Sequence, residues 1–201
     1  MVTVRNRPMF VLLAVGLLAV NGCAGSSRYV NTSTPDNMGS GFSDTDVKLM
    51  VDDIMTDLLQ APFLERYKTP ITISLLHISN KTSEFIDTDA LLGDKMMASI
   101  IKSGSGVFEF VDRKMLDETI RESELAADGL VAQKDATRLG RAAGVTLIMA
   151  GDLTSIRKMD RKEDQRFYRL SLRLVDTERN TVVWTDDKEI RKLAKKGVVQ
   201  W

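Results

Sequence analysis

The sequence predicts an α/β protein of the α+β type, with a mixed sheet of about five strands that is covered by helices and ends in an antiparallel meander. Two strand-like segments in the first half are separated by an amphipathic helical segment, which is the pattern of a βαβ unit. The last third alternates apolar and polar residues without intervening helices, as antiparallel strands with one solvated face do. With 43% hydrophobic residues among 201, the chain has enough apolar material for one core.

The first predicted helix follows Ser43, which can cap its amino end, and Asp46 adds a negative charge that favours this end. Apolar residues then recur at helical spacing until Ala61-Pro62 ends or bends the helix. The other elements expected in the first half are a strand from Ile71 to about Ile78, a polar loop from Ser79 to Ser83, a helix from about Asp87 to Lys102, a strand from Val107 to Val111, and helices from Arg113 to Ala127 and from Asp135 to Ala143.

The second half is expected to contain three strands joined as a meander. In the middle one, alternate residues from Tyr168 to Leu174 should be packed, and Arg169, Ser171 and Arg173 should face water. The segment from Met159 to Arg166 is interpreted as a polar loop inserted in the sheet. The three predicted strands are Val145 to Leu153, Phe167 to Val175 and Thr181 to Thr185, with a turn from Asp176 to Asn180 before the last.

The amino-terminal residues are typical of a bacterial lipoprotein signal. Arg5 and Arg7 precede an unbroken apolar run from Met9 to Val20, and Cys23, the only cysteine in the chain, follows Gly22. In a lipoprotein this thiol takes a diacylglycerol and the new amine takes a fatty acid such as palmitate. We therefore divide the chain into a signal peptide (1–22), a lipid-anchored flexible tether (23–41) and one globular domain (42–201). The alternative is an ordinary secreted protein with an incidental cysteine.

The charge balance excludes a nucleic-acid binder by bulk charge. The whole chain has 28 basic and 28 acidic residues, and loss of Arg5 and Arg7 with the signal leaves 26 against 28, a net charge of −2. No second apolar run is long enough to cross a membrane. Contact with the membrane is therefore expected through the lipid anchor only.

Sequence motifs for catalysis are missing. The chain has no Gly-x-Ser-x-Gly and no phosphate-binding loop, and His77 is its only histidine. Adjacent carboxylates such as Asp52-Asp53 diverge on a helix and are interpreted as solvated. We therefore expect no catalytic residues, no metal site and no cofactor, and we expect a binding protein rather than an enzyme.

Several short motifs, in their order and spacing, resemble the LpoB family of penicillin-binding protein activators. The resemblance implies a fold like the amino-terminal domain of TolB, a place in the outer membrane facing the periplasm, and a role in cell-wall synthesis and cell shape through binding and stimulating a bifunctional penicillin-binding protein. A monomer is expected. The motifs are Cys23, Arg28-Tyr29-Val30, Phe42 to Asp46, Ile78 to Thr82, Phe108 to Asp112, Ala142 to Val145, Leu174 to Thr177 and Val182 to Trp184.

A second function stays open, namely a lipid-anchored binding module for outer-membrane assembly or secretion, similar to curli-secretion lipoproteins or to TolB. Two loops are candidate partner contacts, because loops carry function more often than helices or strands. One is the polar tip Asn80, Lys81 and Thr82, and the other is Gln133 and Lys134. The alternative is that both are solvated connectors, in which case Arg157 to Arg166 is the next candidate.

Replacing Cys23 tests the anchor. Because Cys23 is the only residue that can carry a thioether-linked lipid, Cys23→Ser should leave a soluble or uncleaved, mislocalised protein. Membrane fractionation of cells measures this. Recovery of the variant as mature protein in the outer membrane would contradict the lipoprotein interpretation.

Overall fold

In the computed structural model, residues 28–112 and 144–195 are described. The predicted signal peptide, Cys23, the helices predicted at 113–127 and 135–143, and the candidates Gln133 and Lys134 lie outside these residues. The chain divides into two units, Met1–Thr34 and Pro35–Trp201. In the described part of the first, Thr34 N donates to Asn31 O (3.0 Å) to close a turn. No helix within residues 28–112 and 144–195 has the length and apolarity to span a bilayer.

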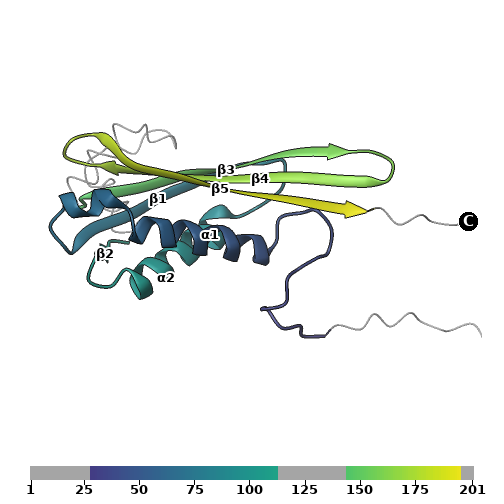
Figure 1. The fold of residues 1–201 in the computed structure, drawn as a ribbon, viewed down its shortest axis with the longest axis horizontal. Coiled ribbons are helices and arrows are strands. Elements are labelled where there is room, and N and C mark those ends of the chain that lie inside the picture. Colours follow the sequence, from purple (N-terminus) through teal and green to yellow (C-terminus); the bar gives the residue numbers. More distant parts are fainter. Residues whose placement is uncertain (1–27, 113–143, 196–201) are drawn as a thin grey trace, which may run out of the picture. The chain divides into compact units, whose positions relative to one another are not determined.

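A five-stranded mixed sheet forms the centre of the second unit, as the sequence predicts (Figure 1). Its strand order is β2-β1-β3-β4-β5. β1 pairs in parallel with both β2 and β3, and the β3–β4 and β4–β5 pairs are antiparallel. The strands are β1 (Ile71–Lys81), β2 (Phe108–Phe110), β3 (Leu147–Met159), β4 (Glu163–Asp176) and β5 (Thr181–Lys195).

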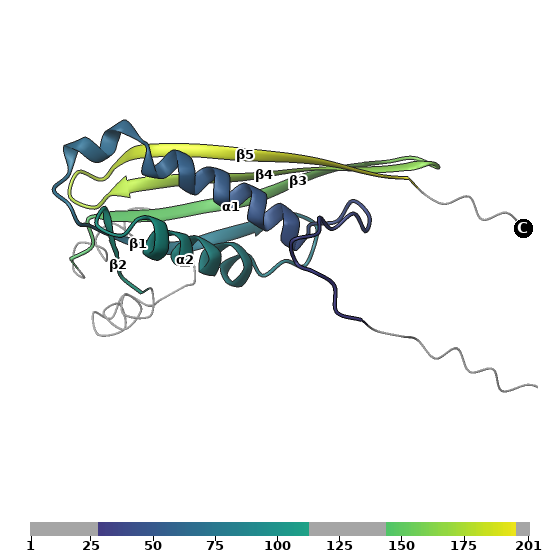
Figure 2. The same ribbon diagram turned by 60° about the horizontal axis from the view of Figure 1, so that its bottom comes forward.

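Two α-helices cover one face of this sheet (Figures 1 and 2). α1 (Asp44–Leu59) begins at Ser43 with a capping box, in which Ser43 and Asp46 each accept a hydrogen bond from the other's backbone amide. A 3₁₀ turn, η1 (Pro62–Arg66), follows it and starts at Pro62. α2 (Asp94–Ser103) is preceded by a π-helical turn, η2 (Asp89–Gly93). The helix predicted from about Asp87 therefore begins with this π-helical turn, and its α-helical part starts only at Asp94.

The core lies between these helices and the sheet. Tyr168, Leu170, Leu172 and Leu174 of β4 are buried there, which confirms the predicted alternation. Trp184 of β5 pairs with Leu174 and packs against the core, although it is only partly buried. A smaller cluster, formed by Val145 and Ile148 with Leu76 and Val111, completes the apolar packing of the described residues.

The strands extend further than their hydrophobic patterns predict. β3 runs to Met159 and β4 starts at Glu163, so the polar loop predicted at Met159 to Arg166 is wrong: the connection between the strands is residues 160–162. The backbones of the two strands pair in register across this region, and Arg157 binds Asp164. The predicted loop at Ser79 is also corrected, because Asn80 and Lys81 belong to β1.

A register shift in β1 explains why that strand does not keep one alternation. The shift lies between Leu75 and Ile78 in the pairing with β3, as a β-bulge produces. Ile71 and Ile73 before it and Ile78 after it are all buried in the same core, although they differ in parity.

Gly151 of β3 provides a test of the close pairing between β3 and β4. A Cβ at this position would lie 2.4 Å from Leu172 Cδ2 and 2.5 Å from the Ser171 carbonyl oxygen. Gly151→Ala should therefore lower the free energy of unfolding by about 1–3 kcal/mol through overpacking, as measured by urea denaturation. Ser155→Ala on the same strand is the control and should stay within about 0.5 kcal/mol. Equal stability of Gly151→Ala and wild type would contradict the tight fit.

Candidate functional site

The far end of the three-stranded meander is the candidate site, because its strands run on past the amino end of α1 (Figures 1 and 2). We call this region the ribbon and define it as residues 155–168 and 190–195. It contains eight basic and three acidic residues, in a chain whose basic and acidic residues are equal in number. The ribbon is thus a positively charged extension of the sheet.

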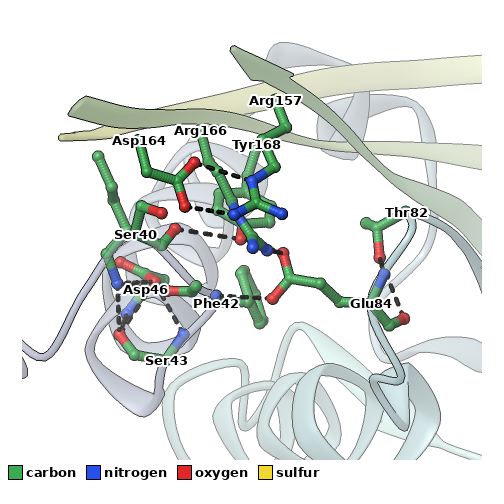
Figure 3. Close-up of polar contacts among 12 residues, drawn as sticks. Ser40, Phe42, Ser43, Asp46, Thr82, Glu84, Arg157, Asp164, Arg166 and Tyr168 are labelled. Carbon is green, nitrogen blue, oxygen red and sulfur yellow. Dashed lines mark hydrogen bonds and ion pairs between the residues drawn. The ribbon is translucent and has the colours of Figure 1, made fainter. Parts of the chain in front are cut away.

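A partly buried carboxylate fixes the base of the ribbon on the side that the helices cover. Glu84, in the loop after β1, lies between β4 and the start of α1 (Figure 3). Its Oε1 accepts the hydroxyl of Tyr168 and pairs with Arg166, and its Oε2 accepts the amide of Phe42 at 3.3 Å. The Phe42 ring packs on Tyr168 with 5.2 Å between centroids. One side chain therefore connects the loop, the sheet and the segment that leads into α1.

A second carboxylate holds the segment before α1 against β5. Asp46 Oδ2 accepts hydrogen bonds from Ser43 and pairs with Lys192 Nζ at 2.8 Å, and both side chains are largely buried. The same ammonium donates to the carbonyl of Gly41 at 2.7 Å, and the Tyr168 hydroxyl lies 3.3 Å from the carbonyl of Ser40. The last residues of the predicted tether are therefore attached to β4 and β5.

Nearer the tip, Asp164 and Arg157 join β4 to β3. Arg157 Nε and Nη2 donate to the two carboxylate oxygens at 2.8 and 2.6 Å, a bidentate pair (Figure 3). Hydrogen bonding to Arg157 lowers the pKa of Asp164 to about 2, so the carboxylate is ionised at neutral pH. The pair keeps the two strands in register where no apolar core lies beneath them.

The electrostatics of the Glu84 cluster favour one arrangement of charge. Burial alone would raise the pKa of Glu84, but hydrogen bonds from Tyr168, the Phe42 amide and Arg166 outweigh it and keep that pKa below its usual value. Burial, together with the bond to Glu84, raises the pKa of Tyr168 far above its ordinary value of 10.0. Glu84 is therefore ionised and Tyr168 neutral across the physiological range.

These groups position the chain rather than perform chemistry. Glu84, Asp46 and Asp164 each interact with a cation and with further donors, so none of them is available as a general base or nucleophile. Among residues 28–112 and 144–195 no three or more His, Cys, Asp or Glu side chains are grouped as metal ligands. His77 is exposed, and its Nδ1 lies 2.7 Å from Asp89.

The predicted contacts Asn80, Lys81 and Thr82 do not form one surface. Asn80 Nδ2 donates to the carbonyls of Glu84 (2.9 Å) and Ile86 (3.1 Å), and its Oδ1 accepts the amide of Thr82, so these two residues shape the loop that presents Glu84. Lys81 instead pairs with Asp152 of β3 at 2.8 Å. Their binding role stays a prediction, as it does for Gln133 and Lys134 outside the described residues.

No local sequence pattern predicts the Glu84 cluster. Its members lie far apart in the chain: Phe42 and Glu84 are separated by 42 positions, and Ser40 and Tyr168 by 128. A weak signal was present, because Tyr168 occupies a packed position of its strand and a buried tyrosine hydroxyl needs a partner.

Comparison with known proteins gives one family match. Residues 46–190, more than two thirds of the chain, match the family model of the peptidoglycan-synthase activator LpoB. The LpoB C-terminal domains from Salmonella enterica and from Escherichia coli each superpose with a TM-score of 0.56 at 13% identity, over 72% of this chain and 98% of the domain. No curated protein sequence matches. At this identity the structures establish the fold, and the family model establishes the family.

The pH dependence of unfolding tests the bond between Tyr168 and Glu84. A tyrosine whose pKa is raised by folding stabilises the fold fully below its unfolded pKa and loses this effect as the pH rises through the folded pKa. Between about pH 10 and 11, urea titrations should therefore show a steeper loss of stability in wild type than in Tyr168→Phe. At neutral pH the variant should be less stable by about 1.5–3 kcal/mol, since it loses a hydrogen bond to a charged group.

The exposed Tyr29 supplies the matched control for this measurement. Tyr29→Phe should leave both the neutral stability and the alkaline slope unchanged. Identical slopes for wild type and Tyr168→Phe would show that the hydroxyl does not interact with the carboxylate.

Proposed function

Because the chain belongs to the LpoB family of peptidoglycan-synthase activators, we propose that it is an outer-membrane lipoprotein that binds a bifunctional penicillin-binding protein and stimulates it. The observation that carries the proposal is the family match over residues 46–190. The α+β fold of the LpoB C-terminal domain supports it. In this proposal the chain has no catalytic activity of its own and acts as a regulator.

The proposed anchor explains how the domain would reach its partner. Lipidated Cys23 holds the chain at the membrane, and the tether (23–41) has 19 residues. Because Ser40 and Gly41 are attached to the sheet, residues 23–39 are the part that can extend, and at roughly 3.3–3.6 Å per residue they reach no more than about 61 Å. Such confinement raises the effective concentration of the domain at a partner that lies within the reach of the tether. At a partner beyond that reach, the effective concentration is negligible. The tether length therefore sets which synthase molecules the domain can meet.

Activation needs more than binding. A regulator shifts a conformational equilibrium only by the difference in its affinity for the two states. We propose that the domain binds the active state of the synthase more tightly than the inactive one, where about 1.4 kcal/mol of difference gives about a tenfold shift. The hydrogen-bonded base of the ribbon supports this, because a rigid surface loses little conformational entropy on docking.

Synthesis assays should separate activation from anchoring. The purified chain should raise the rate at which the periplasmic part of the cognate synthase polymerises and cross-links lipid-linked precursor, with saturation at the binding stoichiometry. Cys23→Ser should stimulate equally in solution, because the anchor is not part of the contact, and should fail to support activation in cells. Binding without any change in rate would contradict the activator role and favour a plain binding module.

A further inference from the structure

The open face of the ribbon, opposite the Glu84 cluster, exposes apolar side chains on adjacent strands. Ile156 of β3 is 59% exposed and Leu193 of β5 is 51% exposed. Phe167 of β4 is half-buried and pairs in register with Ile156 on one side and Arg191 on the other. In the next row, Lys158 pairs with Gln165, and Gln165 with Leu193. Two neighbouring rows therefore place three apolar side chains together on one face.

This face is hollowed. A groove of about 350 Å³ has Ile156 and Phe167 as its apolar lining, with polar and basic side chains around them. Scattered exposed apolar residues are ordinary on protein surfaces, but a contiguous set with a polar rim is typical of an interaction site. The residues that line the groove are Ile156, Lys158, Gln165, Phe167, Arg169 and Arg191.

The charge of the groove has one sign. Three of its lining residues are basic and none is acidic. Arg169 is bound to Glu189 and lies 5.8 Å from the centre of the Phe167 ring, which fixes it as one wall. Lys158 and Arg191 are exposed, and neither forms an ion pair with another residue of the described chain. Two cations thus flank an apolar floor without a carboxylate between them.

We propose that this groove is the docking surface for the synthase, and that it receives a protruding segment of the partner in which carboxylates flank an apolar side chain. The proposal rests on the proposed function. The apolar side chain would cover Ile156 and Phe167, and the carboxylates would lie on Lys158 and Arg191. A second copy of this chain fits poorly, because its own ribbon carries the same excess of positive charge. An acidic protein surface satisfies both features of the groove.

Charge reversal tests the rim. In the full-length lipidated chain in detergent, Lys158→Glu with Arg191→Glu should weaken binding to the periplasmic part of the cognate synthase at least tenfold and flatten its salt dependence. The matched control is Arg66→Glu with Lys68→Glu, which makes the same change in net charge at exposed residues in and just after η1, outside the ribbon. The control should bind within about twofold of wild type.

Polar replacement tests the floor independently of charge. Ile156→Ser should weaken binding at least fivefold, with little effect on the urea midpoint because the side chain is already exposed. Ile101→Ser is the control, since Ile101 of α2 is exposed to a similar extent (56%). Should the double reversal not fold, Lys158→Ala with Arg191→Ala replaces it and should weaken binding at least threefold.

Each outcome decides one question. If wild type binds the synthase and both ribbon variants bind as tightly as wild type, the groove is not the docking surface. The proposed function would still stand. Failure of wild type to bind the synthase would overturn the proposed function and the groove together. A third arm makes the same substitutions in the unlipidated Cys23→Ser chain and titrates them, without detergent, with phosphatidylglycerol vesicles. Loss of vesicle binding in the double reversal with unchanged synthase binding would assign the surface to anionic lipid and overturn the protein partner.

Discussion

The ionised carboxylate of Glu84 is the constraint on which the ribbon end of the domain depends. Removing a charge from water is costly unless it is paired and hydrogen-bonded, and this partly buried one has all its partners only when Tyr168, Arg166 and the Phe42 amide are in place. The loop after β1, the segment before α1 and strand β4 must therefore be positioned together. Displacement of any one of them leaves a partly buried carboxylate without one of its partners.

This requirement explains why the two faces of the ribbon differ. On the face toward the helices, Glu84, Asp46 and Asp164 each form an ion pair with a basic residue of the ribbon. These charged groups are therefore already paired within the domain. The opposite face has no such internal partners for Lys158 and Arg191 among the described residues, and it retains exposed apolar side chains. One face thus provides rigidity, and the other is available for recognition.

Local signals predicted those elements whose burial follows a simple period. The helix capped by Ser43 and the alternating strand from Tyr168 to Leu174 appear in the structure as predicted. Both the helix and the strand have one apolar side and one polar side, which gives their sequences a clear period. The segment from Met159 to Arg166 is predicted as a loop because residues such as Asp164 and Gln165 are polar and carry no hydrophobic period, yet Met159 lies in β3 and Glu163 to Arg166 lie in β4. The Glu84 cluster joins distant positions, so no window of sequence contains its members together.

The attachment of Ser40 and Gly41 to the sheet has a mechanical consequence. A pull on the chain from before residue 36 loads the hydrogen bond from the Asp36 amide to Thr45 in the first turn of α1, and then the contacts that these two carbonyls make with Tyr168 of β4 and Lys192 of β5. At Ser40 and Gly41 the load passes to strands that are hydrogen-bonded to each other, so the first turn of α1, whose end would otherwise fray, does not bear it alone. When the amino-terminal segment is under tension, the sheet therefore shares the load that reaches the helix.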